Sequence, residues 1–266
     1  METQLNGSIA LVPAKERFIN FLIITGLVSL FAISLMMMDL PIAAFVSRFE
    51  RLPLVMRQFM SLNFTIMADA LGQLLISISM AIAALLLGGI VSLFLAFLSA
   101  TNTAPSKIIS VIIKGFVSTI RAIPNLVLIL LIIASLGLGY VAAVASLTLS
   151  SMGYFTKAFA STIEDQDHAL IETMQATGAN WFQIVVHGFF PNVLPSFLAW
   201  ISIRLEMSIA ESISLGVIGA GGIGTMLIRS LRTHQHADVS LLILIIFTTM
   251  LSIEIVLNIF KKRANT

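Results

Sequence analysis

Long stretches without any charged residue constrain this chain most. Ala122–Thr156 is a run of 35 residues that contains no acidic or basic side chain, and Phe18–Met38 and Leu71–Ala100 are two more such runs. A transmembrane helix needs about 20 mostly apolar residues, because it rises about 1.5 Å per residue through about 30 Å of hydrocarbon. The runs therefore predict helices that span a membrane.

The composition supports the same conclusion. Apolar residues make up 58% of the 266-residue chain and charged residues only 11%, whereas soluble domains carry about 25% charged residues. The net charge is +2, and no basic stripe is interleaved with aromatic residues, so nothing points to nucleic-acid binding. Cysteine is absent, which excludes thiolate metal sites and cysteine nucleophiles.

We expect an all-α membrane protein with about six crossings. The first run is too long for the apolar part of a cleaved signal peptide, so it is predicted to be a retained helix. The 35-residue run is too long for one crossing and is expected to turn at Gly137-Leu138-Gly139. The predicted crossings are Phe18–Met38, Leu71–Ala100, one that ends at Gly137, one that ends near Thr156, Asn192–Ser212 and Val239–Phe260.

Six crossings place both termini on the same side of the membrane. The distribution of lysine and arginine predicts that this side is cytoplasmic. Within Leu71–Ala100, the Gly88-Gly89 pair is expected to let a neighbouring helix approach closely.

The segment before the 35-residue run has a basic face. Lys107, Lys114 and Arg121 are spaced by seven and share one side of a helix. Two interpretations are open. The segment lies at the headgroup boundary before the chain bends at Pro124, or it is an ordinary helix whose basic side chains reach the headgroups.

One long polar stretch, Glu164–His187, interrupts the second half of the chain. It is predicted to form two short helices broken at Gly178, since glycine allows the bend, and Pro191 can start the next helix. Such helices suit a groove on a partner protein, although an ordinary membrane-surface loop is the alternative. The apolar residues expected to face the partner are Trp181, Phe182, Ile184 and Val185.

The spacing of Glu172, Gly178 and Pro191 resembles the "EAA" docking loop of ABC importer membrane subunits. Departures from that loop are Thr173 and Met174 in place of alanines, Gly188 in place of the usual isoleucine and Phe190 in place of leucine.

Further segments extend the resemblance over about residues 70–260. They are Arg121-Ala122-Ile123-Pro124, Ala176-Thr177-Gly178-Ala179, Arg204-Leu205-Glu206 and the glycine segment Gly216–Gly224. In this order they are similar to the permease subunits of phosphonate-type ABC importers, which share this layout with methionine-type permeases.

The resemblance implies a type I importer permease in the cell inner membrane. It implies a homodimer with two copies of a separate ATPase and a periplasmic or lipid-anchored substrate-binding protein. It also implies a boundary between residues 1–68, an N-terminal helix and outer loop, and a core of residues 69–266 with a coupling loop at 164–191. The chain has no Gly-x4-Gly-Lys-Ser/Thr loop, so a partner is expected to hydrolyse ATP. No cofactor, metal or catalytic residue is expected.

Two groups of site residues follow from the resemblance and the sequence. The ATPase-coupling group is Glu172, Ala176, Thr177, Gly178, Ala179 and Pro191. The group expected to shape or gate the translocation path is Arg121, Pro124, Arg204, Ser208, Glu211, Gly219, Gly221, Gly222 and Gly224.

Arg204 is the sharpest functional candidate. It lies inside a predicted crossing, where a cation costs about 2.5–3.5 kcal/mol on insertion scales. Ser208 and Glu211 follow at i+4 and i+7 and share its face. Arg204 either attracts an anionic substrate or forms a structural pair with Glu211, and the sequence favours neither.

Two apparent motifs are rejected. Gly219, Gly221 and Gly224 match Gly-x-Gly-x-x-Gly, but they follow a membrane helix rather than a strand, so a close-packed turn or gate is expected instead of a dinucleotide site. His234, His236 and Asp238 lack a fourth ligand nearby and are expected to lie in a solvated outer loop.

The predicted function is ATP-driven import of a phosphonate or a related small phosphorus oxyanion. The nearest alternative keeps the architecture and carries methionine or another amino acid. A secondary transporter would need internal repeats, and a membrane enzyme would need convergent catalytic groups. The sequence shows neither feature.

Overall fold

The computed structural model describes residues 14–38, 46–47, 49 and 52–264. The chain divides into two compact units, residues 1–56 and 57–266, and each is described here by itself. The described residues contain helices and turns and no strand, which confirms the predicted all-α class. Parts of the predicted N-terminal region, residues 1–13 and 39–45, lie outside the described residues.

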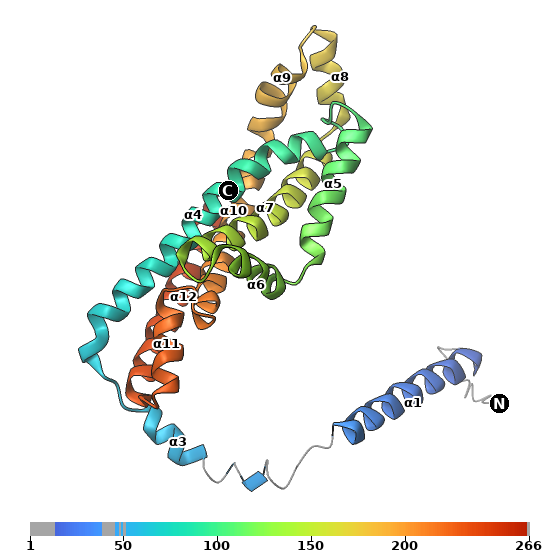
Figure 1. Cartoon of the computed structure of the whole chain (residues 1–266). Helices are drawn as coiled ribbons and strands as arrows, with labels where there is room; N and C mark the ends of the chain where they lie inside the picture. The colour runs from blue at the N-terminus through green and yellow to red at the C-terminus, as the bar shows by residue number, and fades with distance from the viewer. Residues whose placement is uncertain (1–13, 39–45, 48, 50–51, 265–266) are drawn as a thin grey trace, which may run out of the picture. The chain divides into compact units, whose positions relative to one another are not determined.

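Figure 1 labels most of the helices along the chain. Their bounds are α1 (Ala14–Met37), α3 (Leu52–Phe59), η1 (Phe64–Ile66), α4 (Met67–Ser99), α5 (Lys107–Ala122), α6 (Asn125–Leu136), α7 (Tyr140–Glu164), α8 (His168–Ala176), α9 (Trp181–Gln183), η2 (Ile184–Phe189), α10 (Phe190–Val217), α11 (Ile223–Arg232) and α12 (His236–Ala264).

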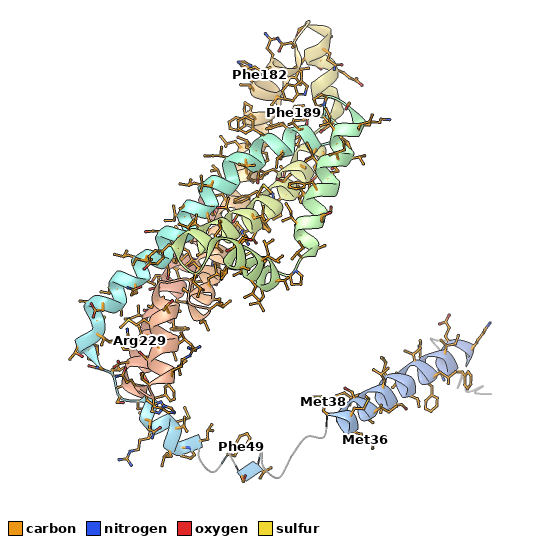
Figure 2. The ribbon with its side chains drawn as sticks, in the orientation of Figure 1. Met36, Met38, Phe49, Phe182, Phe189 and Arg229 are labelled. Carbon is orange, nitrogen blue, oxygen red and sulfur yellow. The ribbon has the colours of Figure 1, made fainter. Side chains whose placement is uncertain are left out.

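In the first unit, α1 is a 24-residue helix that contains the predicted first crossing. Its large apolar side chains are exposed on all sides within the chain, including Met36 and Met38 near its end (Figure 2). A helix that is apolar all round needs lipid or protein on every face. This agrees with the interpretation of α1 as a membrane span.

The second unit is an elongated bundle. α4 and α7 pack along each other, and α10 packs against both of them. The short helices α8 and α9 lie at one end of this unit and α11 lies toward the other end (Figure 1). The bundle therefore separates the polar loop of residues 164–189 from the glycine segment that precedes α11.

The close packing of α4 against α7 depends on Gly88. A Cβ atom there would lie 2.9 Å from both the Ser151 Cβ and the Thr148 carbonyl oxygen, too close for any larger residue without movement. Gly89 behaves differently, because a Cβ there would make only ordinary contact with Phe155. The prediction that the glycine pair allows close helix approach is therefore confirmed for Gly88.

Four helical segments are long and apolar enough to cross a membrane, and the bent pair α5–α6 makes five, among the residues that the structure describes. The remaining predicted crossing, the one expected to end near Thr156, falls on α7, which has 25 residues and is not among the five. Helices α4, α5, α6 and α10 all pack on α7, so its hydroxyl groups face protein. Because hydroxyl groups are polar, they lower the mean hydropathy of α7. The buried hydroxyl-bearing residues of α7 are Ser146, Ser151, Thr156 and Thr162.

Two predicted turns are confirmed. α5 and α6 meet at 92° at Ile123-Pro124, since the fixed φ of proline and its missing N–H end a helix. The turn between α6 and α7 falls at Gly137-Leu138-Gly139. Gly137 and Gly139 have φ values of 82° and 144°, which only glycine adopts readily.

The polar stretch forms one separate short helix rather than the two that were predicted. α8 ends at Ala176, but α9 continues through the π-helical turn η2 directly into α10. A capping box between Asn180 and Gln183 starts this second helix. Pro191 lies in the first turn of α10 as predicted. Pro191 does not interrupt the helix that enters from η2. The backbone there widens to a π turn, in which the Phe190 N–H donates to the Val185 carbonyl.

Candidate functional site

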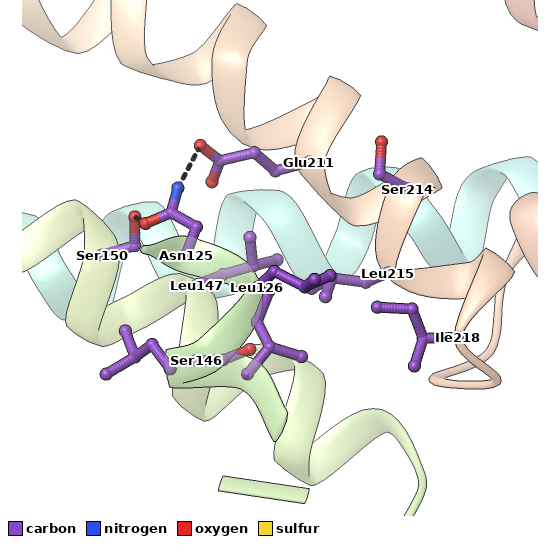
Figure 3. Close-up of a pocket in the computed structure, with 11 residues that line it drawn as sticks. Asn125, Leu126, Ser146, Leu147, Ser150, Glu211, Ser214, Leu215 and Ile218 are labelled. Carbon is purple, nitrogen blue, oxygen red and sulfur yellow. Dashed lines mark hydrogen bonds between the residues drawn. The ribbon is translucent and has the colours of Figure 1, made fainter. Parts of the chain in front are cut away.

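A cavity of about 190 Å³ lies between α6, α7 and α10, and Figure 3 shows the residues around it. Three polar side chains at its wall come from three different helices: Asn125 from α6, Ser150 from α7 and Glu211 from α10. The other lining residues are Leu126, Leu128, Ile129, Ser146, Leu147, Ser214, Leu215 and Ile218. The cavity is thus mostly apolar with a few convergent polar groups, as small-molecule sites usually are.

Arg204 lies behind this wall and is 2% exposed. Its guanidinium makes a bidentate pair with Glu211, at 3.0 Å from Nη1 to Oε1 and 2.8 Å from Nη2 to Oε2. Nε donates to Ser151 Oγ at 3.1 Å, and Nη2 also donates to Ser150 Oγ at 3.1 Å. Four of the five guanidinium N–H donors are therefore engaged.

Glu211 and Asn125 close this network into a ring, and Figure 3 shows the hydrogen bond between these two side chains. Asn125 Nδ2 donates to Glu211 Oε1 at 3.2 Å, and Ser150 Oγ donates to Asn125 Oδ1 at 3.3 Å. We call Arg204, Glu211, Asn125 and Ser150 the polar ring. The ring ties the first residue of α6, just after the bend at Pro124, to the middle of α7 and α10.

The two interpretations of Arg204 can now be placed in the structure. Arg204 forms the predicted ion pair with Glu211, and its guanidinium does not line the cavity in this conformation. The Glu211 side chain is 25% exposed and forms part of the cavity wall. The group that meets the cavity first is therefore the carboxylate rather than the cation.

Ser208 was expected to share the Arg204 face. It is fully buried, and its hydroxyl has no hydrogen-bond partner among the described residues. It does not line the cavity. Arg121 lies in the last turn of α5, where its side chain covers Gly153 of α7.

The glycines of the path group lie at the far end of α10 and form a close-packed turn. A Cβ on Gly224 would collide with the Ile213 carbonyl oxygen, and one on Gly222 would collide with Ser77 Oγ. Ser77 Oγ also accepts a hydrogen bond from the Ile223 N–H at 3.1 Å. Gly219 occupies the left-handed position that ends α10, with a φ of 98°.

This glycine turn borders a second cavity of about 570 Å³. Gly221, Thr225 and Arg229 line it from the α11 side, and Asp69 and Gln73 line it from α4. Most of the path residues predicted from sequence therefore fall into two places: Arg204 and Glu211 lie at the polar ring in the C-terminal half of α10, and the glycines lie just beyond the C-terminal end of α10.

In the coupling group, Gly178 ends α8. Its φ is 81°, and a Cβ there would meet no other atom within 4 Å. The Ala179 N–H donates to Met174 and the Gly178 N–H donates to Gln175, which is the Schellman pattern. Glycine is thus required by backbone conformation rather than by crowding. Glu172, Ala176 and Thr177 are exposed on the same helix end.

Of the four apolar residues predicted to face a partner from this loop, two are unavailable. Ile184 and Val185 are buried in the chain's own core against Phe189, because the second loop helix packs onto the bundle. Trp181 remains partly exposed, and its Nε1 donates to the Thr103 carbonyl at 2.5 Å. Phe182 is 65% exposed and remains available (Figure 2).

An ion pair that sequence spacing did not predict lies at the same end. Lys114 Nζ lies 2.7 Å from Glu164 Oε1, which also accepts from the Thr101 N–H at 2.7 Å. Burial alone would raise the pKa of Glu164, but the hydrogen bonds from Lys114 and Thr101 outweigh it and hold the pKa below its ordinary value. This network fixes the α4–α5 corner to the end of α7.

The expectation of a solvated loop for His234, His236 and Asp238 is wrong for Asp238, because His236 and Asp238 lie in the first turn of α12 and Asp238 is buried. Asp238 accepts a hydrogen bond from Asn63 Nδ2 at 2.7 Å, and the His236 ring lies 5.3 Å from the Phe59 ring. Among the described residues, no group of three acidic or histidine side chains is placed to hold a metal ion.

Comparison with known proteins now decides the family. Residues 92–265 match the family described as binding-protein-dependent transport system inner membrane component. The chain belongs to this family. It is an ABC importer permease, which confirms the resemblance found in the docking loop and the glycine segment.

Two relatives of this permease carry transport names. It is 32% identical over 186 residues to the phosphite transport system permease protein PtxC of Stutzerimonas stutzeri, covering 70% of this chain and 68% of that protein. It is 35% identical over 153 residues to the phosphate-import permease protein PhnE of Mycolicibacterium smegmatis, covering 58% of this chain and 29% of that longer protein.

A solved structure has the same fold. A chain in an inward-facing structure of the MetNI methionine ABC transporter matches this permease with a TM-score of 0.68 at 20% identity. The match covers 76% of this permease and 99% of that chain. At this identity the match shows the fold alone.

The sequence did not single out Asn125, Ser150 or Ser151 as site residues. The only available signal was indirect: Asn125 follows the proline bend, and Ser146 and Ser150 stand four apart on a helix of low hydropathy. Spacing alone could not assign them to Arg204, because they come from two other helices.

Proposed function

We propose that this permease moves a phosphonate or a related small phosphorus oxyanion, such as phosphite or a phosphate ester, into the cytoplasm. One observation carries the proposal: a buried guanidinium stands beside a bundle cavity in a chain that is 32% identical to a phosphite permease. Guanidinium groups bind carboxylates and phosphorus oxyanions through two parallel hydrogen bonds.

ATP hydrolysis is assigned to a separate dimeric ATPase. The exposed end of α8, with Glu172 and Gly178, and the exposed Phe182 are proposed to dock into it. A substrate-binding protein on the outer side delivers the anion to a dimer of this permease. Both termini are assigned to the cytoplasm.

Methionine or another amino acid is the rival cargo. The MetNI match shows a shared fold and does not decide the cargo, and an amino-acid carboxylate could use the same guanidinium. The two cargoes therefore have to be separated by transport.

The test is ATP-dependent uptake of labelled methylphosphonate, phosphite and methionine by cells with and without this gene. We expect loss of phosphonate or phosphite uptake and unchanged methionine uptake. Loss of methionine uptake alone would reject the phosphorus assignment and leave the permease standing. At matched amounts of folded protein, Arg204→Gln should abolish the uptake that depends on this gene, with Glu254→Gln, at an exposed carboxylate on α12, as the matched control.

The coupling assignment has its own test. The ATPase should co-purify with the wild-type permease and be lost with Gly178→Val, which cannot adopt the left-handed conformation without strain. Transport by the purified permease without any ATPase would reject the assignment and favour a secondary transporter.

A further inference from the structure

The cavity wall presents an unexpected set of groups for an anion carrier. Ser146 Oγ donates to the Ala143 carbonyl, Ser214 Oγ donates to the Ala210 carbonyl, and Ser150 Oγ donates within the polar ring. Their hydrogens are therefore used in these bonds. Oxygen lone pairs remain at Ser146 and Ser214, whereas Ser150 Oγ also accepts from Arg204 Nη2. With the Glu211 carboxylate in the same wall, the cavity repels an anion in this conformation.

The donors suited to an anion are hidden behind that carboxylate. Arg204 and the Asn125 amide both donate to Glu211, with three hydrogen bonds between 2.8 and 3.2 Å. The Glu211 carboxylate presents two oxygens on one central atom to the guanidinium. A phosphorus oxyanion would bind a guanidinium through two oxygens in the same bidentate way.

We propose that Glu211 is a resident anion, and that a phosphorus oxyanion in transit takes its place on Arg204 and Asn125. This inference rests on the proposed function and adds the residue that the substrate must displace. The permease then has two states at the polar ring: carboxylate on the guanidinium when it is empty, and substrate on the guanidinium when it is loaded.

Arg204 and Glu211 differ in burial and in anchoring, as an exchange of Glu211 for substrate requires. Arg204 is 2% exposed and is anchored by Ser151 through Nε and by Ser150 through Nη2. Glu211 is 25% exposed, and in the part of the chain that the structure describes its carboxylate accepts hydrogen bonds only from Arg204 and Asn125, the groups that the substrate would use. Rotation of Glu211 into the cavity would therefore free the donors while Arg204 stays in place.

The exchange also keeps the buried charge compensated. An uncompensated guanidinium in the bundle is unfavourable, so an empty permease needs an internal anion. A carboxylate competitor weakens the apparent affinity for the substrate, which helps release. A transport path must let its cargo leave as well as enter.

The experiment is a chemical rescue of Glu211→Ala. The full-length chain is purified in detergent, and its melting temperature is measured with sodium formate, sodium phosphite or sodium chloride at equal ionic strength. Formate and phosphite should each raise the melting temperature of the variant by about 3–6 °C at about ten times their Kd. They should raise the wild-type value by less than half as much, because Glu211 already fills the position.

Two further variants make the result decisive. Arg204→Gln combined with Glu211→Ala has no cation to compensate, and it should show no rescue by either anion. Glu254→Ala, which removes an exposed carboxylate from α12, should respond as the wild type does.

Absence of rescue by both anions would overturn the proposal, since Arg204 would then be unreachable. Rescue by formate without phosphite would also overturn it, because the position would exclude a tetrahedral anion. Equal rescue of the Arg204→Gln double variant would place the anion elsewhere. Rescue that depends on Arg204 in a permease without phosphite or phosphonate uptake would reject the proposed function and retain the anion position.

Discussion

Among the residues that the structure describes, two ion pairs of the permease lie in very different surroundings. Arg204–Glu211 lies in the bundle, with side chains 2% and 25% exposed, and Glu211, Ser150 and Ser151 engage four of the five guanidinium N–H donors. Lys114–Glu164 lies near the loop end, with side chains 40% and 31% exposed. Both pairs have nitrogen–oxygen distances below 3 Å, so distance alone does not distinguish them. Burial and the surrounding donors do.

The difference in burial separates the proposed role of the inner pair in transport from the structural role of the outer pair. A buried pair costs several kcal/mol when one partner is lost, whereas a partly exposed pair contributes little. The proposed function assigns a role in transport to this costly cation, which lies inside the bundle beside a cavity. The outer pair has the simpler task of holding the α4–α5 corner to α7.

The largest expected effect is on the inner pair. Arg204→Gln should lower the free energy of unfolding by about 3–5 kcal/mol, because the Glu211 carboxylate and two serine hydroxyls lose their common donor. Lys114→Gln is the matched substitution at the outer pair and should cost less than about 1 kcal/mol. Denaturant titration of both variants in detergent measures the difference. Equal losses would show that burial does not separate the two pairs.

Two glycines of the candidate sites, Gly224 and Gly178, extend the comparison to the backbone. Gly224→Ala should cost about 3 kcal/mol or more, because the new Cβ collides with the Ile213 carbonyl oxygen in the α10–α11 turn. Reduced yield of folded protein and a lower melting temperature would measure it. A variant as stable as the wild type would show that this turn is not close-packed.

At the loop end the corresponding change should be milder. Gly178→Ala meets no atom within 4 Å and strains only the φ of 81°. Its expected cost is about 1–2 kcal/mol, and the strain falls on the end of α8, away from the cavity. Melting temperature and ATPase co-purification are the two measurements. A loss larger than that of Gly224→Ala would reverse the order of the two sites.

The smallest expected effect is the coupling within the outer pair. A double-mutant cycle of Lys114→Gln and Glu164→Gln should give about 0.2–1 kcal/mol at pH 7. Because the pKa of folded Glu164 is lowered, this contribution is present above the pKa of the unfolded glutamate. It disappears as the pH falls through the lower folded value. A coupling that grows on acidification would contradict this assignment.

Sequence patterns predicted the parts of the fold that depend on local rules. Charge-free runs located the apolar helices, Pro124 located the bend between α5 and α6, and Gly178 located the end of α8. Each of these depends on hydropathy or on one residue's backbone preference. The i+7 spacing of Arg204 and Glu211 also placed both on one helical face, where they form a pair.

The parts that failed or were missed depend on packing between helices. Ile184 and Val185 were expected to face a partner but are buried in the bundle, because η2 carries the loop helix straight into α10. The polar ring joins residues up to 86 positions apart. No spacing rule relates Asn125 or Ser150 to Arg204, so only the assembled bundle reveals that they share hydrogen bonds.

The central claim is that the inner pair acts in transport while the outer pair only supports the structure. The most direct measurement is ATP-dependent phosphite uptake by two charge-neutral double variants, Arg204→Gln with Glu211→Gln and Lys114→Gln with Glu164→Gln, at matched amounts of folded protein. The account predicts at least about a tenfold loss, or about 1.4 kcal/mol in the barrier, for the inner double variant and uptake within about twofold of wild type for the outer one. Unchanged uptake by the inner double variant would contradict it.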